Sequence, residues 1–346
     1  MSRMLEEVRQ QPAALERTLS EERKNVEAFR RVMENRRPRL IVLVARGTSD
    51  NAALFGRYLL EITTGIPVSL AAPSITTVYG AEVDYRDALV VAISQSGEST
   101  DTNLVLERAR ARGALTLGIT NESASSLARL AEHVFLVHAG REKSVAATKT
   151  YTGQMLSLYL LAHALGGGVA MSALERLPAS VESVLRLEPE VAALSERYRF
   201  MHYAAVVGRG FNYANAFEFS LKLMETCYVV AERFSSADFL HGPIALIEPS
   251  FPVFAFAPPG PTWKSMDQTL AKLQDLKAEI VAITDPGNSE IAARATRLIR
   301  LPEEVEEVLT PIPYIVPGQL FAACLAAQKG FDPDQPRTIG KVTKTL

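Results

Sequence analysis

Cysteine is scarce in this chain of 346 residues, which holds only two, Cys227 and Cys324. Both lie in apolar, helix-like surroundings far apart in the sequence, so they predict buried, reduced thiols and not a disulfide. The five histidines show no paired spacing with cysteine or carboxylate residues, which argues against a metal site. We therefore expect no metal ion and no other cofactor.

Long apolar runs and blocks of like charge are missing as well. No apolar run approaches the ~18 residues of a membrane span, and residues 1–35, rich in Glu and Arg, lack the apolar centre of a signal peptide. We expect no membrane association and a cytoplasmic location. The formal charge is only -2 and no long basic block occurs, which argues against a nucleic-acid partner. With 47% hydrophobic and 22% charged residues, the chain suits two globular domains of ordinary size.

One pattern of strands and helices is present twice. The run LIVLVARG, ending at Gly47, recurs as YAAVVGRG, ending at Gly210, and ALVVAISQSGEST from Ala88 recurs in outline as FPVFAFAPPGPTW from Phe251. The second copy follows the first by about 164 residues, which is far too long a period for a solenoid. Strands that are apolar throughout and alternate with helices predict parallel sheets covered on both faces. The sequence therefore predicts two similar α/β domains.

The same pattern divides the chain into five segments. We expect a helical segment (1–35), a first α/β domain (36–168), a helical connector (169–199), a second α/β domain (200–330) and a tail (331–346). Pro12 interrupts the first segment, and Pro178 and Pro189 interrupt the connector. In the first domain we expect strands at 40–44, near 68, at 88–94, 115–120 and 134–137, and helices at 49–62, 100–112, 125–130 and 147–164.

Two turns between a strand and a helix predict an anion site. Helix N-termini at the carboxyl ends of parallel strands present N–H groups to a ligand, and Gly97 lets the backbone approach it closely. The polar side chains in these two turns are Thr48, Ser49, Ser94, Gln95, Ser96 and Ser99. Such a set suits one phosphate monoester. The alternative is that these residues are ordinary helix caps and turns.

Nucleotide sites fit less well. No Gly-Lys-Ser/Thr follows either loop, as an ATP site would require. The pair Gly208 and Gly210 has Tyr213 where a dinucleotide fingerprint has its third glycine, so the case for NAD is weak.

A second group of candidate residues lies in the second copy. Lys222 and Glu225 are three residues apart and share a face of a predicted helix with apolar neighbours, where their pKa values can shift so that they move protons. The alternative is a partly exposed salt bridge. His241 lies in SSADFLHGP, where Gly242 and Pro243 fix a turn, and it is a candidate acid or base near neutral pH; the alternative is a structural histidine.

These motifs, with several others, resemble one known family. The chain contains, in order, MLEEVRQQPAALERTL, RGTSDNA, SQSGEST, VAATKTYT, LKLMET, HGPIALIE, VEEVLTPIPYIVPGQL and DQPRTIGKVTKTL. Proteins with sugar isomerase (SIS) domains are similar over nearly the whole chain, specifically the isomerase half of glucosamine-6-phosphate synthase and the stand-alone glucosamine-6-phosphate deaminases. The resemblance implies an α/β fold of two tandem flavodoxin-like, three-layer αβα domains with parallel sheets. It also implies a homodimer in which His241 is donated across the interface, and a tail that closes the active site.

The resemblance also implies roles for individual residues. The sugar phosphate would be held by Thr48, Ser94, Gln95, Ser96 and Ser99. Glu225 would move the proton between C1 and C2, His241 would open the sugar ring, and Lys222 would assist proton movement. Lys341 would meet the sugar carbonyl and form a Schiff base.

Two further positions, Val145 and Ala147, line the sugar pocket in the resemblance. Ala147 replaces a serine of the synthases, and Arg46 stands where they carry cysteine. These departures concern the substrate and leave the proton-transfer chemistry intact.

The expected reaction follows from what the synthases have and this sequence does not. Their glutamine-hydrolysing domain begins with a cysteine nucleophile, whereas this chain begins MSRMLEE and has no cysteine before Cys227. We expect a deaminase that turns glucosamine-6-phosphate and water into fructose-6-phosphate and ammonia. The alternatives are a deaminase or isomerase for another sugar phosphate, such as galactosamine-6-phosphate, and a sugar-phosphate sensor without catalysis; residues 1–35 are too short for the DNA-binding domain of such a regulator.

Overall fold

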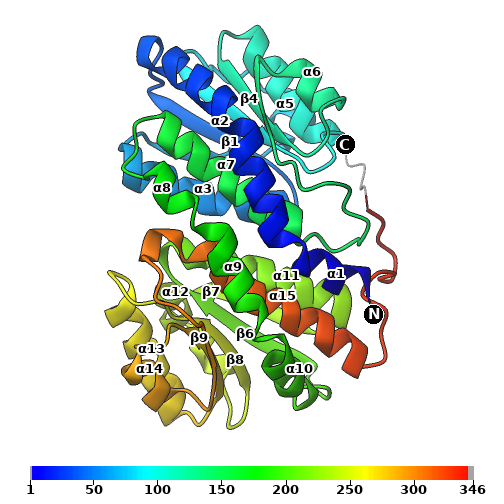
Figure 1. Ribbon diagram of the computed structural model, residues 1–346, viewed down its shortest axis with the longest axis vertical. Helices are drawn as coiled ribbons and strands as arrows, with labels where there is room; N and C mark the ends of the chain where they lie inside the picture. The colour runs from blue at the N-terminus through cyan, green and yellow to red at the C-terminus, as the bar shows by residue number, and fades with distance from the viewer. Residues whose placement is uncertain (1, 342–346) are drawn as a thin grey trace. The chain divides into compact units, whose positions relative to one another are not determined.

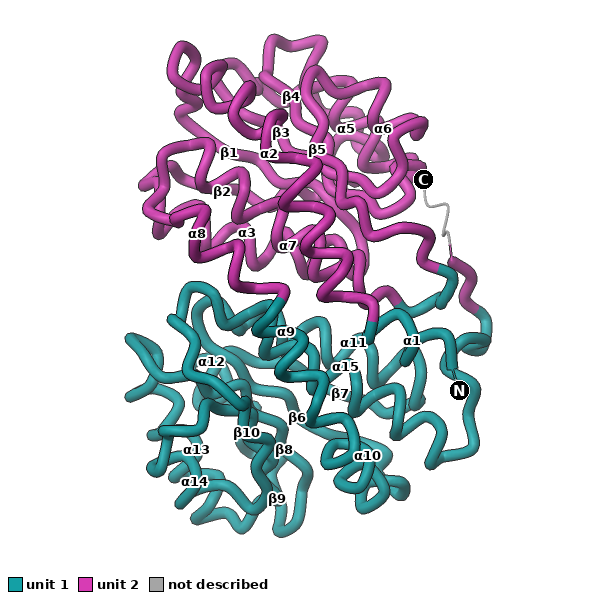
Figure 2. Tube along the Cα trace, in the orientation of Figure 1, with its two compact units in different colours: residues 1–9, 143–146, 179–338 teal, residues 10–142, 147–178, 339–346 magenta. Residues whose placement is uncertain are grey.

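The computed structural model describes residues 2–341 and divides them into two compact units (Figure 1). We call residues 10–142, 147–178 and 339–341 the first-repeat unit, and residues 2–9, 143–146 and 179–338 the second-repeat unit (Figure 2). The last part of the predicted tail, residues 342–346, lies outside the described residues.

The first-repeat unit is built on a parallel five-stranded sheet of order β2-β1-β3-β4-β5. Its strands are β1 (Leu40–Val44), β2 (Val68–Leu70), β3 (Ala88–Ile93), β4 (Leu115–Thr120) and β5 (His133–Leu136). Its helices are α2 (Gln11–Asn35), α3 (Thr48–Thr64), α4 (Ser74–Thr77), α5 (Thr100–Ala111), α6 (Ser126–Leu130), α7 (Lys149–Ala164) and α8 (Met171–Leu174). Helices α5 and α6 cover one face of the sheet, and α2, α3 and α7 cover the other.

The second-repeat unit has the same plan, with a parallel sheet of order β10-β9-β8-β6-β7. Its strands are β6 (Tyr203–Gly208), β7 (Val230–Ser235), β8 (Pro252–Phe256), β9 (Glu279–Thr284) and β10 (Arg297–Arg300). Its α-helices are α1 (Arg3–Arg9), α9 (Leu177–Leu185, whose first two residues belong to the first-repeat unit), α10 (Glu188–Glu196), α11 (Tyr213–Cys227), α12 (Ser236–Leu240), α13 (Trp263–Asp275), α14 (Ser289–Arg294) and α15 (Pro311–Gln328). Three 3-10 turns complete it: η1 (Gly210–Asn212), η2 (Pro243–Leu246) and η3 (Glu307–Leu309).

Each sheet is buried on both faces, as the continuous apolar strands predict. All six residues of β3 are buried, because α5 packs on one side of it and α3 on the other. In the second-repeat unit, α12, α13 and α14 cover one face of the sheet, and Phe219 of α11 packs edge-on against Phe254 of β8 and Phe321 of α15 on the other.

The predicted fold class is confirmed. Both sheets have the strand order of flavodoxin-like domains, in which the first strand of the repeat lies between the second and the third. The connector contains α8, α9 and α10, and Pro178 and Pro189 lie in the first turns of α9 and α10. The N–H groups of the first turn have no partner within a helix, so a proline there costs no helical hydrogen bond. Each proline therefore lies at the start of a helix and also interrupts the connector.

Two smaller expectations concern the cysteines and the membrane. Cys227 is buried in α11, Cys324 is partly buried in α15, and neither forms a disulfide. Among residues 2–341, no helix is both long and apolar enough to span a bilayer.

Candidate functional site

The turn between β1 and α3 lies at the carboxyl edge of the first sheet. Gly47 has φ +57°, which favours glycine, and α3 begins at the next residue, Thr48. Ser49 is buried and accepts a hydrogen bond from Nε2 of Gln154 on α7 at 3.0 Å. Thr48 is half-buried. The turn therefore places Thr48 at the start of a 17-residue helix, where an anion is stabilised.

The turn between β3 and α5 is folded tightly around Gly97. This glycine has φ +66°, and a Cβ there would lie 2.2 Å from Oγ of Ser125, so no other residue fits without movement. The Oγ of Ser94 accepts the N–H of Gly97 at 3.1 Å, and the Oγ of Ser96 accepts the N–H of Glu98 at 3.3 Å. Each hydroxyl thus makes a bond within the turn, as expected if these residues were only ordinary turn residues. Because each acts as an acceptor in that bond, its own O–H proton can still be donated to a ligand.

Two more side chains of this turn complete the predicted set. Gln95 is half-buried, and the Oγ of Ser99, just before α5, lies 3.0 Å from Oγ1 of Thr102. Ser99 is the N-cap residue of α5, in extended backbone conformation. The turn therefore presents amide and hydroxyl groups beside a helix N-terminus.

Arg46 joins the two turns. Its Nε and Nη2 donate to Oδ2 of Asp101, in the first turn of α5, at 3.1 and 2.6 Å. Asp101 is buried, whereas the Arg46 side chain is about half exposed. The contact shows that the β1–α3 and β3–α5 turns lie side by side and places a guanidinium at the same edge of the sheet. The sequence indicated Arg46 only as a departure from the synthases.

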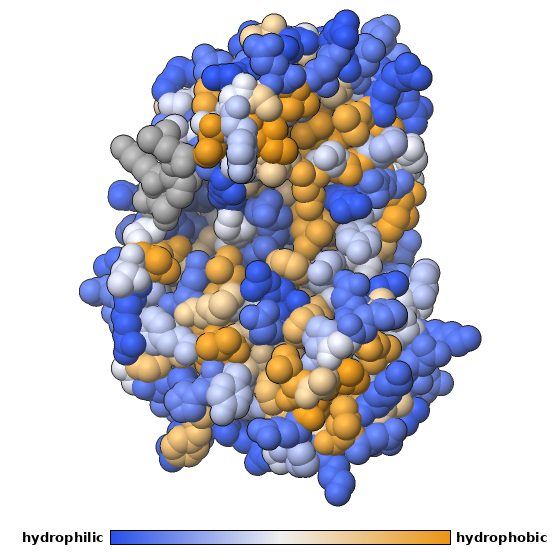
Figure 3. Space-filling view, turned by 180° about the vertical axis from the view of Figure 1, so that it is seen from behind, coloured by the Kyte–Doolittle hydropathy of each residue, from blue (hydrophilic) through white to orange (hydrophobic). Residues whose placement is uncertain are grey.

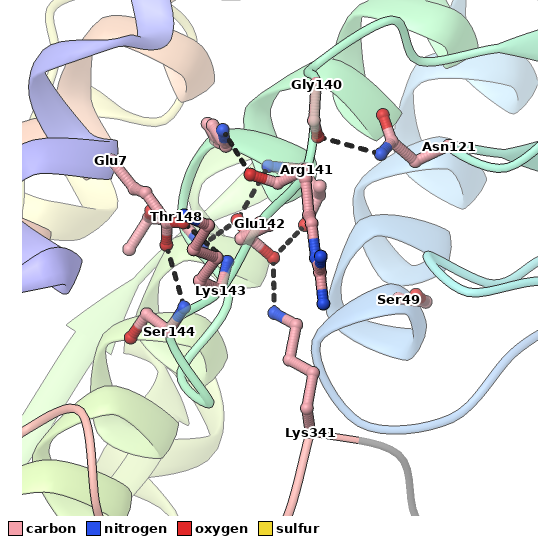
Figure 4. Close-up of polar contacts among 12 residues, drawn as sticks. Glu7, Ser49, Asn121, Gly140, Arg141, Glu142, Lys143, Ser144, Thr148 and Lys341 are labelled. Carbon is pink, nitrogen blue, oxygen red and sulfur yellow. Dashed lines mark hydrogen bonds and ion pairs between the residues drawn. The ribbon is translucent and has the colours of Figure 1, made fainter.

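Lys341 of the tail is paired with a buried carboxylate that was not among the residues predicted from the sequence. Its Nζ lies 2.7 Å from Oε2 of Glu142, which is fully buried in the loop after β5 (Figure 4). Burial alone would raise the pKa of Glu142, but the charge and hydrogen bond of Lys341 and the bonds from Thr148 and Thr150 outweigh it and lower that pKa. Glu142 is therefore ionised at neutral pH. Its position just after a strand end, in AGREKSVAATKT, was the signal that could have indicated it.

The loop that follows Glu142 contains the two predicted sugar-pocket residues. Ala147 is half-buried and lies just before α7; Val145 is half-buried in the segment 143–146, which belongs to the second-repeat unit. The buried carboxylate of Glu7 on α1 fixes that segment by accepting the N–H groups of Lys143 and Ser144 (Figure 4).

Lys222 lies between two carboxylates of α11. Its Nζ is 2.6 Å from Oε2 of Glu225 and 3.3 Å from Oε1 of Glu218, and both Lys222 and Glu218 are fully buried. Burial alone would lower the pKa of Lys222, but the two carboxylates outweigh it and raise that pKa. Lys222 is therefore a fixed cation at neutral pH, and Glu225, 21% exposed, is the member of the group that solvent reaches. Glu218 was missed, although its i, i+4 spacing to Lys222 was the available signal.

His241 is exposed at the end of α12. Its backbone N–H donates to the carbonyl of Asp238 at 3.0 Å, and Gly242, with φ +134°, follows it. The short helix before it is capped by Ser235, whose Oγ accepts the N–H of Asp238 at 3.1 Å. The imidazole is thus presented to solvent from a turn that is fixed at both ends.

The predicted residues fall into two groups. The first-repeat unit brings the two phosphate-loop turns together and pairs Lys341 with Glu142, and it also holds Ala147. The second-repeat unit pairs Lys222 with Glu225 and holds His241 and Val145.

Comparison with known proteins agrees with this architecture. The SIS domain family matches residues 36–164 and 202–329. Glutamine–fructose-6-phosphate aminotransferase (isomerizing) from Methanothermobacter thermautotrophicus is 36% identical over 341 residues, covering 98% of this chain and 56% of that protein. The chain thus spans little more than half the length of that relative.

Solved structures show the same fold. The C-terminal domain of glucosamine-fructose-6-phosphate aminotransferase from Francisella tularensis has a TM-score of 0.89 at 27% identity, covering 97% of this chain and 98% of that one. A putative phosphosugar isomerase from Silicibacter pomeroyi has a TM-score of 0.86 at 32% identity, covering 96% and 100%. Glucosamine-6-phosphate deaminase from Thermotoga maritima shares the fold at 21% identity, with a TM-score of 0.77 and coverage of 99% and 100%. With both of its α/β domains matched, the chain belongs to the SIS domain family.

Proposed function

We propose that this SIS protein is an amino sugar phosphate deaminase that converts glucosamine-6-phosphate and water into fructose-6-phosphate and ammonia. The observation that supports this most directly is the pair of turns joined by Arg46 and Asp101, whose hydroxyl groups and helix N-termini suit one phosphate monoester. The name of the Methanothermobacter relative includes fructose-6-phosphate, and the Thermotoga protein with this fold is named a glucosamine-6-phosphate deaminase.

The phosphate binds at the first-repeat turns. Ser94 and Ser96 accept turn bonds from the backbone and donate their hydroxyl protons to phosphate oxygens. Thr48, Gln95 and Ser99 add further donors, and the positive ends of α3 and α5 favour the dianion. The phosphate thereby fixes one end of an open-chain sugar and leaves the other end for chemistry.

The proton transfer is assigned to Glu225. It removes the proton from C2 of the open-chain amino aldehyde and returns it to C1, while a second proton passes from the C2 amine to the C1 oxygen. The aldehyde thereby becomes a C1 alcohol and the amine becomes a C2 imine, which water hydrolyses to the ketone and ammonia. Lys222 is held as a cation 2.6 Å from the Glu225 carboxylate and keeps it in one position during both steps. The positive charge of Lys222 also stabilises the negative charge that develops on the sugar oxygen.

The tail lysine is assigned to the carbonyl carbon. The neutral amine of Lys341 forms a bond from Nζ to the carbonyl carbon of the sugar. The carbonyl oxygen leaves as water, which gives a Schiff base. The structure supports this role by giving Lys341 a fixed position on the same unit as the phosphate turns, at 2.7 Å from Glu142.

Ring opening is assigned to His241 of a second copy of the chain. Its imidazole is exposed on a fixed turn, and Leu246, five residues later, is 58% exposed. In the first-repeat unit, Val78 and Tyr79 are 65% and 81% exposed. Apolar patches also interrupt the hydrophilic surface seen in Figure 3. Exposed apolar groups of this kind are typical of protein interfaces, which supports a homodimer.

A phosphosugar isomerase that releases no ammonia is the second candidate. The Silicibacter protein, at 32% identity, is described as a putative phosphosugar isomerase. Proton transfer between C1 and C2 by Glu225 serves both reactions, because it does not depend on whether C2 carries nitrogen or oxygen.

The test is to incubate the purified protein with glucosamine-6-phosphate, without glutamine, and to measure ammonia and fructose-6-phosphate in parallel. We expect both products at equal rates, and neither with Glu225→Gln. Interconversion of glucose-6-phosphate and fructose-6-phosphate without ammonia from the amino sugar would establish the second candidate. Binding of the sugar phosphate without either reaction would make the protein a sensor.

A further inference from the structure

Glu142 makes more contacts than a helix cap needs. Its Oε1 accepts the N–H groups of Thr148 and Thr150 at 2.9 and 3.1 Å, at the start of α7. Its Oε2 accepts the hydroxyl of Thr150 and the ammonium of Lys341, both at 2.7 Å. The side chain is fully buried, so its negative charge is compensated by protein groups and not by water.

These contacts connect a helix start with the tail. Oε1 of Glu142 is held by the backbone at the start of α7, a 16-residue helix in which almost every residue is buried. The other oxygen is thereby fixed in direction, and Lys341, 199 residues further along the chain, is bound to it. The Lys341 side chain is 24% exposed, so it is anchored by a buried group at Nζ and is still partly accessible to solvent (Figure 4).

We propose that Glu142 is the positioning residue for Lys341, and that it is the counter-ion of the Schiff base this lysine forms. The proposal rests on the proposed function, which assigns Lys341 to the sugar carbonyl. Overall, the ammonium and the carbonyl group give an iminium ion and one water molecule, so the positive charge is conserved. The iminium keeps one N–H, which continues to donate to Oε2 of Glu142.

Glu142 therefore acts before and after the bond is formed. Before the reaction it confines a long, flexible side chain to one position, which removes the entropic cost of finding the carbonyl. Afterwards it stabilises the cation that withdraws electrons from the adjacent carbon. Glu142 does not act as the base that deprotonates Lys341, because the lowered pKa of its carboxyl makes it a poor proton acceptor.

The first test traps the Schiff base. Fructose-6-phosphate and borohydride are added, and the secondary amine at Lys341 is quantified by peptide mass spectrometry. We expect trapping by Glu142→Gln to be about 100-fold slower than by the wild type, since a misplaced reacting group costs about this much, and to be partly restored in Glu142→Asp. The dissociation constant for glucitol-6-phosphate, which has no carbonyl, should change less than about twofold. Equal trapping rates in wild type and Glu142→Gln would overturn the proposal.

Glu7→Gln is the matched control. Glu7 is also buried and accepts two backbone N–H groups of the same loop, those of Lys143 and Ser144. If Glu142 served only to stabilise the loop, Glu7→Gln would slow trapping to the same extent, which would also overturn the proposal. We expect instead that Glu7→Gln lowers the thermal stability and leaves the trapping rate close to that of the wild type.

A second measurement needs no substrate and so separates this proposal from the proposed function. The protein is labelled with a trace of acetic anhydride at pH 8, and the labelling of Lys341 is measured against that of the exposed Lys24. Release of Lys341 from Glu142 should raise this ratio in Glu142→Gln and not in Glu7→Gln. An unchanged ratio would refute the anchoring by Glu142. A raised ratio in a protein whose wild type traps no sugar would uphold the anchoring and refute the Schiff-base role.

Discussion

Lys222→Met leaves two carboxylates of α11 without their shared cation, and the consequence can be estimated from the burial of each group. Glu218 and Lys222 are fully buried, and the Glu225 side chain is 21% exposed. Removing one partner of a buried ion pair costs about 3–5 kcal/mol, because the other charge is left unpaired away from water. We expect Lys222→Met to lower the free energy of unfolding by about this amount at pH 8.

The pH dependence gives a second, sharper expectation. Because the pKa of Lys222 is raised in the folded protein, this residue contributes fully to the free energy of unfolding at any pH below its ordinary pKa of 10.5. That contribution is lost only as pH rises through the higher folded-state pKa. It is therefore constant between pH 5 and 8. In the variant, a buried carboxylate without a cation is stabilised by taking up a proton. Lys222→Met should accordingly lower the free energy of unfolding less at pH 5 than at pH 8.

The assay is urea unfolding followed by the fluorescence of Trp263, the single tryptophan of the chain, which lies in the same unit as Lys222. Arg294→Met is the matched control: its pair with Asp267 at 3.0 Å is partly exposed and should cost less than about 1 kcal/mol. The double variant Glu218→Gln/Lys222→Met should regain much of the loss. A loss no larger than that of Arg294→Met, or one equal at pH 5 and pH 8, would refute the reasoning.

Three further outcomes test the site. Glu225→Gln should abolish turnover and change the affinity for glucitol-6-phosphate by less than about twofold, as titration calorimetry can show; a large loss of binding would mean that Glu225 is structural. His241→Ala should slow the reaction most with ring-closed substrate, and mixing it with Glu225→Gln should restore activity in steady-state assays if each site uses the histidine of the other chain. Gly97→Ala should weaken phosphate binding and lower stability by about 1–3 kcal/mol, because the added Cβ would lie 2.2 Å from Oγ of Ser125 at a positive φ; wild-type binding and unfolding would contradict this.

The fold could be predicted because its signals are local. Strands such as β3 and β4 are apolar at every position and all six of their residues are buried, so their character and limits are visible in the sequence. The second sheet could then be predicted from the first, because the same order of elements gives the same strand order in both sheets. Helix α4 was missed, since four residues are too few to show a period.

The polar contacts of the site could be predicted only in part. The i, i+3 spacing of Lys222 and Glu225 predicts a shared face, but not that burial would enclose Lys222 between two carboxylates. The pairing of Glu142 with Lys341 joins residues 199 positions apart, and no local pattern links them. Contacts of this kind depend on the tertiary fold, which brings charged groups together only after the elements have packed.

The two repeats share a strand order but differ in charge at their ligand edges. In the second-repeat unit the carboxyl ends of the strands border a cavity of about 720 Å³, whose lining includes Asp285, Glu290, Glu304 and Glu306. Burial and the nearby Glu304 raise the pKa of Asp285, as expected where negative charges lie close together away from water, and burial alone raises the pKa of Glu307. Such an edge repels phosphate, whereas the first-repeat edge offers hydroxyl groups and a guanidinium. Titration calorimetry with glucitol-6-phosphate should therefore give one bound phosphate ester per chain, and a stoichiometry of two would show that the second edge has kept the ancestral site.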